Sequence, residues 1–187
     1  MSEHANLEHG GDKRIALLIA ILALFLALVE TGAKSAQTEA ITRNVESTNL
    51  WAFFQARSIR QTTVRTAAEQ AELQKATTTD PTARAAIEAQ QKVWRDTAAR
   101  WESEPSTGEG RKELTERARE TETQRDYSMA KYHLYEYSAA LFQVAIVIAS
   151  ASIVTSVSML AILGVLLGVG GLGFGAIGLL APLAVHF

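Results

Sequence analysis

The run from Tyr137 to Phe187, "YSAALFQVAIVIASASIVTSVSMLAILGVLLGVGGLGFGAIGLLAPLAVHF", decides the fold because it holds no Asp, Glu, Lys or Arg. A helix needs about 20 apolar residues to cross a bilayer, so this run is long enough for two crossings and a turn. We expect transmembrane helices at 138–156 and 159–183, joined by a turn at Thr155-Ser156-Val157-Ser158. A turn among the later glycines would leave a last segment too short to span.

A first crossing is predicted at 13–33. Its apolar centre, Ile15 to Val29 ("IALLIAILALFLALV"), follows Lys13-Arg14. It reaches roughly 22 Å, short of the ~30 Å hydrocarbon core, so the residues up to position 33 extend it. The alternative is a signal peptide with Lys13-Arg14 as its basic region and cleavage near residue 35. Residues 1–12 are acidic and unusually long for such a region, and we expect them to form a mobile tail.

One ion pair is expected at the end of the first crossing. Glu30 lies four residues before Lys34, the favourable order for a helical ion pair. Glu30 is the one ionisable residue near the hydrocarbon, and charges inside a membrane are functional candidates by default. Its position at the helix end favours a structural role instead.

The charged middle of the chain, residues 34–137, reads as helix almost throughout. It is rich in Ala, Gln, Glu and Arg and holds no Gly before Gly108. Asp80-Pro81 has the pattern of an N-cap followed by Pro at the first helical position, and residues 104–110 form a turn. We therefore predict an extramembrane helical bundle or coiled-coil insert. Its helices are expected at 34–77, 81–103 and 110–137, the last running into the second crossing.

Five large rings stand out in this insert. Trp51, Phe53 and Phe54 fall within four residues, and Trp94 and Trp101 are seven residues apart on the next predicted helix. We expect the first three to pack on the two later tryptophans as the main core of a helical bundle. A helix lying on the membrane surface and a pocket for a ligand or partner are the alternatives.

Small residues form a seam along the last predicted helix. The spacings of four and three place them on one face, where two helix backbones can approach closely. They are Gly164, Gly168, Gly171, Gly175 and Gly178. The seam can pack within the hairpin, mediate association between chains, or mark a flexible segment.

Tyrosines cluster before the second crossing. Tyr132, Tyr135 and Tyr137, together with Lys131, are expected to form an interfacial belt at the lipid headgroups. Helix–helix packing would be satisfied by one or two of them.

The composition excludes several classes of function. A net charge of −2 argues against a nucleic-acid partner, and the lack of Cys rules out disulfides and thiolate metal sites. The four histidines, His4, His9, His133 and His186, form no metal-binding or catalytic pattern. We expect neither an enzyme nor a cofactor.

Three segments carry a family resemblance: "KRIALLIAILALFLALVETGAKSAQTEAI", "NLWAFFQARSIRQT" and "YSAALFQVAIVIAS". They resemble a family of small bacterial membrane proteins that is catalogued only as a domain of unknown function. The resemblance implies three membrane helices around a helical insert and no known activity. Members often carry basic residues in the last turn, which are absent from Thr155-Ser156-Val157-Ser158 here.

Lys13-Arg14 favours a cytoplasmic N-terminus, which would make residues 34–137 periplasmic in a bacterial inner membrane. Lys34 and Lys131 flank the membrane on the insert side and argue the other way, but long loops translocate largely regardless of charge. The leading functional hypothesis is a non-enzymatic scaffold or accessory protein, bound to the lipid bilayer, that self-associates into a homo-oligomer. The alternatives are an accessory subunit that binds another membrane protein through Trp51, Phe53 and Phe54, and a pore or small transporter.

Overall fold

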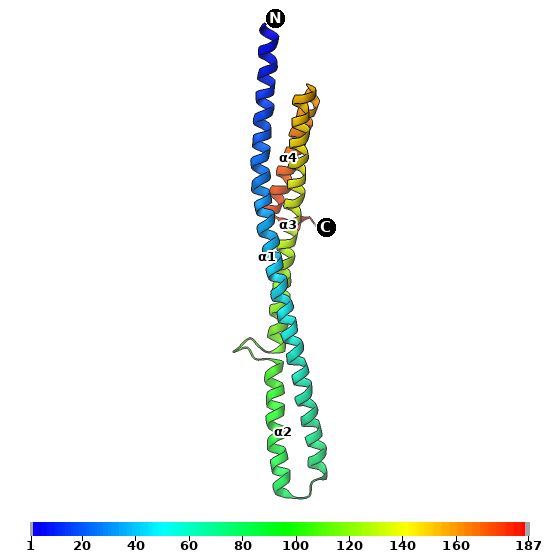
Figure 1. Cartoon of the computed structure of the whole chain (residues 1–187). Helices are drawn as coiled ribbons and strands as arrows, with labels where there is room; N and C mark the ends of the chain where they lie inside the picture. The colour runs from blue at the N-terminus through cyan, green and yellow to red at the C-terminus, as the bar shows by residue number, and fades with distance from the viewer. Residues whose placement is uncertain (1, 186–187) are drawn as a thin grey trace. The chain divides into compact units, whose positions relative to one another are not determined.

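The computed structural model describes the backbone of residues 2–185 and the side chains of residues 13–185. The protein is all-α, as predicted (Figure 1). Its elements in order are α1 (Ser2–Thr77), α2 (Pro81–Glu102), α3 (Arg111–Thr155), α4 (Ser158–Leu180) and a short 3-10 helix, η1 (Pro182–Ala184).

Two pairs of helices that were predicted separately are continuous in the structure. The expected helices 13–33 and 34–77 are one helix, α1, and those at 110–137 and 138–156 are one helix, α3. Gly32, the weak point of α1, remains helical because the ring of Tyr135 packs against it, with Cε2 only 3.0 Å from where a Cβ would stand. α1 begins at Ser2, so the backbone of the expected mobile tail is helical, whereas its side chains lie outside the described residues.

Local sequence explains each break between helices. Asp80 caps α2 by accepting a hydrogen bond from the backbone N–H of Thr82 at 2.9 Å, and Pro81 occupies the first helical position. The loop before α3 turns at Gly108, whose φ of 68° favours glycine. The turn between α3 and α4 places Ser156 at a φ of 55°.

Three helices are long and apolar enough to cross a membrane: Lys13–Thr77 within α1, together with α3 and α4. Within the most apolar stretch of each, 6%, 33% and 17% of the residues are buried inside the protein. Most side chains in these stretches therefore face outward, and they are apolar.

The chain forms two compact units. The apolar unit consists of Met1–Ile41 and Gln124–Phe187. Its core holds Leu22, Phe142 and Ala145, with Phe25 stacked on Phe142 at a centroid distance of 6.0 Å. The helices of this unit pack through these rings and through the glycines of α4.

The polar unit is Thr42–Thr123, and it contains all three tryptophans. Its core holds Leu50 of α1 and Leu114 and Ala118 of α3, against which Trp51 and Phe54 pack. Within this unit α1 and α2 form a helical hairpin, which Figure 1 shows in cyan and green.

Candidate functional site

The aromatic cluster of the polar unit packs differently from the prediction. Trp51 and Phe54 meet edge to face, with ring centroids 5.6 Å apart, and both pack on Leu114 and Ala118 of α3. The indole Nε1 of Trp51 donates a hydrogen bond to a carboxylate oxygen of Glu122 on α3 at 2.8 Å. Packing on the tryptophans of α2 was expected, whereas the contacts found for Trp51 and Phe54 are with Leu50 of α1 and with α3.

Arg57 links the remaining predicted rings. This arginine is only 9% exposed, and its guanidinium carbon lies 5.3 Å from the ring centroid of Phe53 and 5.8 Å from that of Trp101. Its Nη2 donates to a carboxylate oxygen of Glu109 at 2.8 Å, and its Nε donates to the Glu109 carbonyl at 3.1 Å. Trp94 is half-buried on α2 and makes no ring contact among residues 13–185. A buried cation thus holds together two rings that were expected to touch directly.

Two buried glutamines clamp α1 to α2 in reciprocal fashion. Gln61 of α1 donates from Nε2 to the carbonyl of Ala98 at 2.8 Å and to a carboxylate oxygen of Glu102 at 3.0 Å. Gln91 of α2 makes the matching pair of bonds in the opposite direction, at 3.0 and 2.6 Å. Its acceptors are the carbonyl of Ala68 and the carboxylate of Glu72.

Each clamp uses an Ala carbonyl and the Glu one helical turn later on the facing helix. Gln61 and Gln91 are both 2% exposed. A polar residue at a buried seam position fixes the register of two packed helices, because any slip leaves its hydrogen bonds unmade. Nothing in the sequence shows that the acceptors of these two glutamines face them in pairs.

The clamps also shift carboxylate protonation. The hydrogen bond from Gln91 and the nearby charge of Lys75 lower the pKa of Glu72. The hydrogen bond from Gln61 and the charge of Arg111 lower the pKa of Glu102, against a smaller opposing effect of burial. Both carboxylates are therefore held ionised by their partners.

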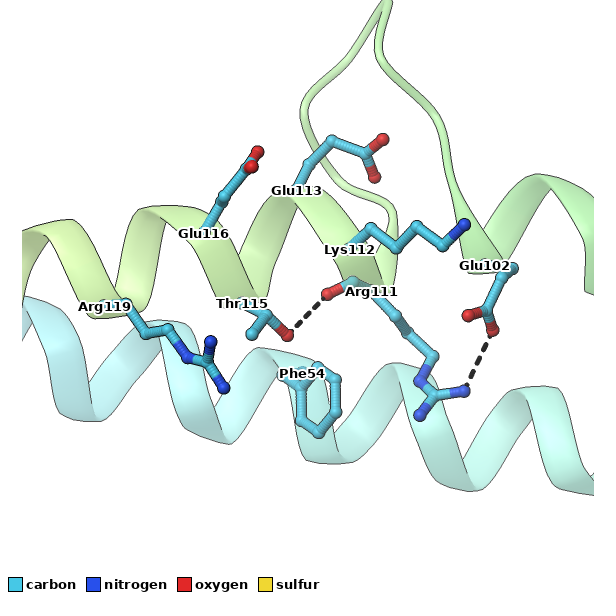
Figure 2. A pocket seen from close by; sticks show the side chains of 8 residues that line it. All are labelled: Phe54, Glu102, Arg111, Lys112, Glu113, Thr115, Glu116 and Arg119. Carbon is cyan, nitrogen blue, oxygen red and sulfur yellow. Dashed lines mark hydrogen bonds and ion pairs between the residues drawn. The ribbon is translucent and has the colours of Figure 1, made fainter.

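A cavity of about 580 Å³ opens beside the Gln61 clamp, where α2 ends and α3 begins. Figure 2 shows the ring of Phe54 between the side chains of Arg111 and Arg119. The guanidinium carbon of Arg111 lies 5.1 Å from the centroid of that ring. Its Nη1 donates to the side-chain oxygen of Gln61 at 2.7 Å and to Glu102 at 3.0 Å, whereas its Nε is buried without a hydrogen-bond partner.

Charged side chains of both signs line the cavity. It holds three basic and three acidic side chains, with Phe54 and Thr115, and no Cys, His or Ser. The Thr115 hydroxyl already donates to the carbonyl of Arg111 at 2.8 Å. Glu113, one of the acids, accepts from the Ser103 hydroxyl, and this bond is the main cause of its lowered pKa. Among residues 13–185 no group of three or more His, Cys, Asp or Glu could hold a metal ion.

The glycine seam of α4 packs against helices of the same chain. Gly164, Gly168, Gly171 and Gly178 are buried and Gly175 is half-buried. A Cβ on Gly168 would stand 2.6 Å from a methyl of Leu22 on α1, and one on Gly171 would stand 3.1 Å from the ring of Phe142 on α3. The seam therefore serves packing within the apolar unit.

A hydrogen bond between helices lies on the same seam. The buried Ser138 hydroxyl donates to the carbonyl of Gly171 at 2.6 Å. This close approach of α3 to α4 requires the missing side chains of Gly171 and Gly175, since a Cβ on Gly175 would lie 3.2 Å from the same hydroxyl. Ser138 is the first residue of the predicted second crossing, and no sequence pattern distinguishes it there.

The tyrosines divide between two roles. Tyr135 is 8% exposed and its ring fills the space between Gly32 and Gly178, so this tyrosine packs between helices. Tyr137 is 44% exposed, and the Tyr132 hydroxyl donates to Glu136 at 2.8 Å, which raises the pKa of that tyrosine. Lys131 lies with its Nζ 5.9 Å from the centroid of the Tyr135 ring.

Glu30 has a different partner from the one expected. It accepts a hydrogen bond from Nε2 of Gln143 on α3 at 3.1 Å, and no ion pair with Lys34 forms among the described residues. An amide on α3 therefore satisfies the carboxylate.

Residues 11–181 match a family described as Domain of unknown function (DUF4337). The chain belongs to this family. The match covers nearly the whole of both units, which confirms the resemblance carried by the three segments quoted above. The DUF4337 description assigns no activity, and no curated protein and no solved structure matches the chain significantly.

Proposed function

We propose that this DUF4337 member is a non-enzymatic integral membrane scaffold that self-associates and presents its polar unit as a rigid helical support. Three apolar helices would anchor it in the lipid bilayer. The proposal places it in the cytoplasmic membrane of a bacterium, with the polar unit on the periplasmic side.

Membrane insertion is supported by the distribution of apolar side chains in the apolar unit. Leu17, Leu24 and Leu28 of α1 are 60–63% exposed, and Val147 of α3 and Leu166 of α4 are 67% and 62% exposed. Leaving such surface in water on three neighbouring helices is costly, at about 25 cal/mol per Å². A bilayer removes that cost, and the helices satisfy their own backbone hydrogen bonds there.

A structural role is supported by the buried polar side chains of the polar unit, which bond to other residues of the same unit. Arg57, Gln61, Gln91 and Glu102 are all engaged in contacts between helices of this unit. A catalytic or binding residue would instead point its polar atoms into a cleft. These contacts stiffen the unit and fix its register, which is what a support needs.

Self-association would use a surface other than the glycine seam, because α1 and α3 already occupy it. The alternative, an accessory subunit binding a membrane protein through the aromatic cluster, has less support. Trp51 and Phe54 are half-buried against the core of the polar unit, and Phe53, at 38% exposure, is the most exposed of the three rings.

The mass of the full-length protein in mild detergent and in lipid nanodiscs tests the proposal. We expect a defined oligomer at nanomolar to micromolar concentration and crosslinked species of the same size in native membranes. A monomer under all these conditions would contradict self-association. Measurable hydrolase or transferase activity of the pure protein that is lost on Arg111→Ala would contradict the non-enzymatic role.

A further inference from the structure

In the polar unit, α1 buries some polar side chains and exposes some large apolar ones. Amphipathic helices bury their apolar stripe and expose charged residues on the opposite face. Here the buried positions include Arg57 and Gln61, at 9% and 2% exposure. The opposite side exposes Val45, Ile59 and Leu73 at 54%, 69% and 71%.

These exposed residues belong to a regular seam. Val45, Ala52, Ile59, Thr66 and Leu73 are spaced by seven residues, and positions 49, 56, 63 and 70 between them hold Asn, Ala, Thr and Gln. All nine side chains are exposed and none is charged. Alternating steps of four and three residues are the spacing by which two helices pack along their length. We call these nine positions the outer face of α1.

We propose that the outer face of α1 binds the same face of a second copy of this chain. This inference rests on the proposed self-association and names the surface for it. Two copies inserted in one membrane with the same orientation bring the outer faces together in parallel and in register. The uncharged seam is then removed from water.

The charges beside the outer face fit this arrangement. In a parallel in-register pair, the position flanking one side of the seam faces the position five residues later on the partner. The resulting pairs contain no two like charges, whose juxtaposition would be unfavourable. They are Ile41 with Glu46, Thr48 with Phe53, Gln55 with Arg60, Thr62 with Ala67, and Glu69 with Gln74, and each holds at most one charge.

The area of the outer face is modest. Positions 45 to 73 span about 42 Å of helix, and a strip about 10 Å wide gives roughly 400 Å² per copy. The total of about 800 Å² is smaller than the ~1,200–2,000 Å² that stable interfaces between soluble proteins bury. Anchoring both copies in one membrane raises their effective concentration and compensates for the modest area.

The absence of cysteine from the chain permits a direct test. Single variants Ile59→Cys and Ala52→Cys of the full-length protein are oxidised mildly in native membranes, with Ala89→Cys on the exposed side of α2 as the matched control. We expect disulfide-linked dimers for the first two and none for the control. Crosslinking of the control alone, or an Ile59→Cys adduct with a different protein, would overturn the assignment of a second copy.

A charge variant separates this inference from the proposed function. Ile59→Glu places two carboxylates opposite each other, so the apparent Kd of the oligomer in detergent should rise about tenfold or more. Gln90→Glu on α2 should leave it unchanged, and circular dichroism should show equal helix content for both. If the Ile59→Glu protein keeps the oligomer Kd of the wild type and Ile59→Cys forms no disulfide-linked dimer, the outer face is not the interface, although self-association itself stands. A wild-type protein that is monomeric throughout would refute both.

Discussion

Replacing Gln61 with leucine should destabilise the polar unit by about 2–3 kcal/mol. The substitution removes the bond to the Ala98 carbonyl and the two bonds shared with Glu102 and Arg111. A net hydrogen bond contributes about 1 kcal/mol between neutral groups and about 1.5–3 when one partner is charged. The sum of about 5 kcal/mol is offset by about 2–3 kcal/mol from burying the leucine side chain.

Tryptophan fluorescence measures this effect selectively, because all three tryptophans lie in the polar unit. Urea unfolding of the full-length protein in a mild nonionic detergent should show a lower midpoint for Gln61→Leu with an unchanged slope. Gln55→Leu, an exposed change on the same helix, should leave the midpoint near that of the wild type. A Gln61→Leu protein as stable as the wild type would refute the view that the clamp contributes stability.

Three further predictions concern pH and the apolar unit. The hydrogen bond from Gln61 lowers the pKa of Glu102 in the folded protein. The ionised Glu102 therefore stabilises the fold above its unfolded-state pKa of about 4.3, and this contribution is lost as the pH falls through its folded-state pKa. The urea midpoint should fall when the pH is lowered below about 4.5, and it should fall less in Gln61→Leu. Gly168→Leu should lower the thermal midpoint in detergent, since even a Cβ there meets a leucine of α1, whereas Gly173→Leu, at a position with nothing within 4 Å, should not. Ser138→Ala should cost about 0.6–2 kcal/mol by losing its bond to the Gly171 carbonyl, as measured by unfolding in mixed micelles; no change would show that bond to be unimportant.

Much of the architecture could be predicted because long apolar runs and Pro or Gly breaks act locally. The charge-free run after Glu136 and the cap at Asp80 fix where helices begin and end without reference to the rest of the chain. Gln61 and Ala68 are seven residues apart, so helix periodicity places them on one face of α1, and both are buried.

Contacts between distant segments could not be predicted in the same way. Glu30 accepts its hydrogen bond from Gln143, which lies on another helix far along the sequence. From the sequence alone, Arg57 would be expected to face solvent. In the structure it is surrounded by Glu109 and two rings. The spacing of the seam glycines is visible in the sequence. The residues of α1 and α3 that pack against them are known only from the structure.

Cysteine labelling from one side of the membrane tests membrane insertion most directly, at the crossing by α3. Ala89→Cys in the polar unit and Ser156→Cys in the turn between α3 and α4 are treated in intact cells with a membrane-impermeant maleimide. We predict that Ala89→Cys reacts at once and that Ser156→Cys reacts only after the membrane is permeabilised. The opposite pattern would reverse the orientation, and equal reactivity of both positions before permeabilisation would contradict a membrane-spanning fold.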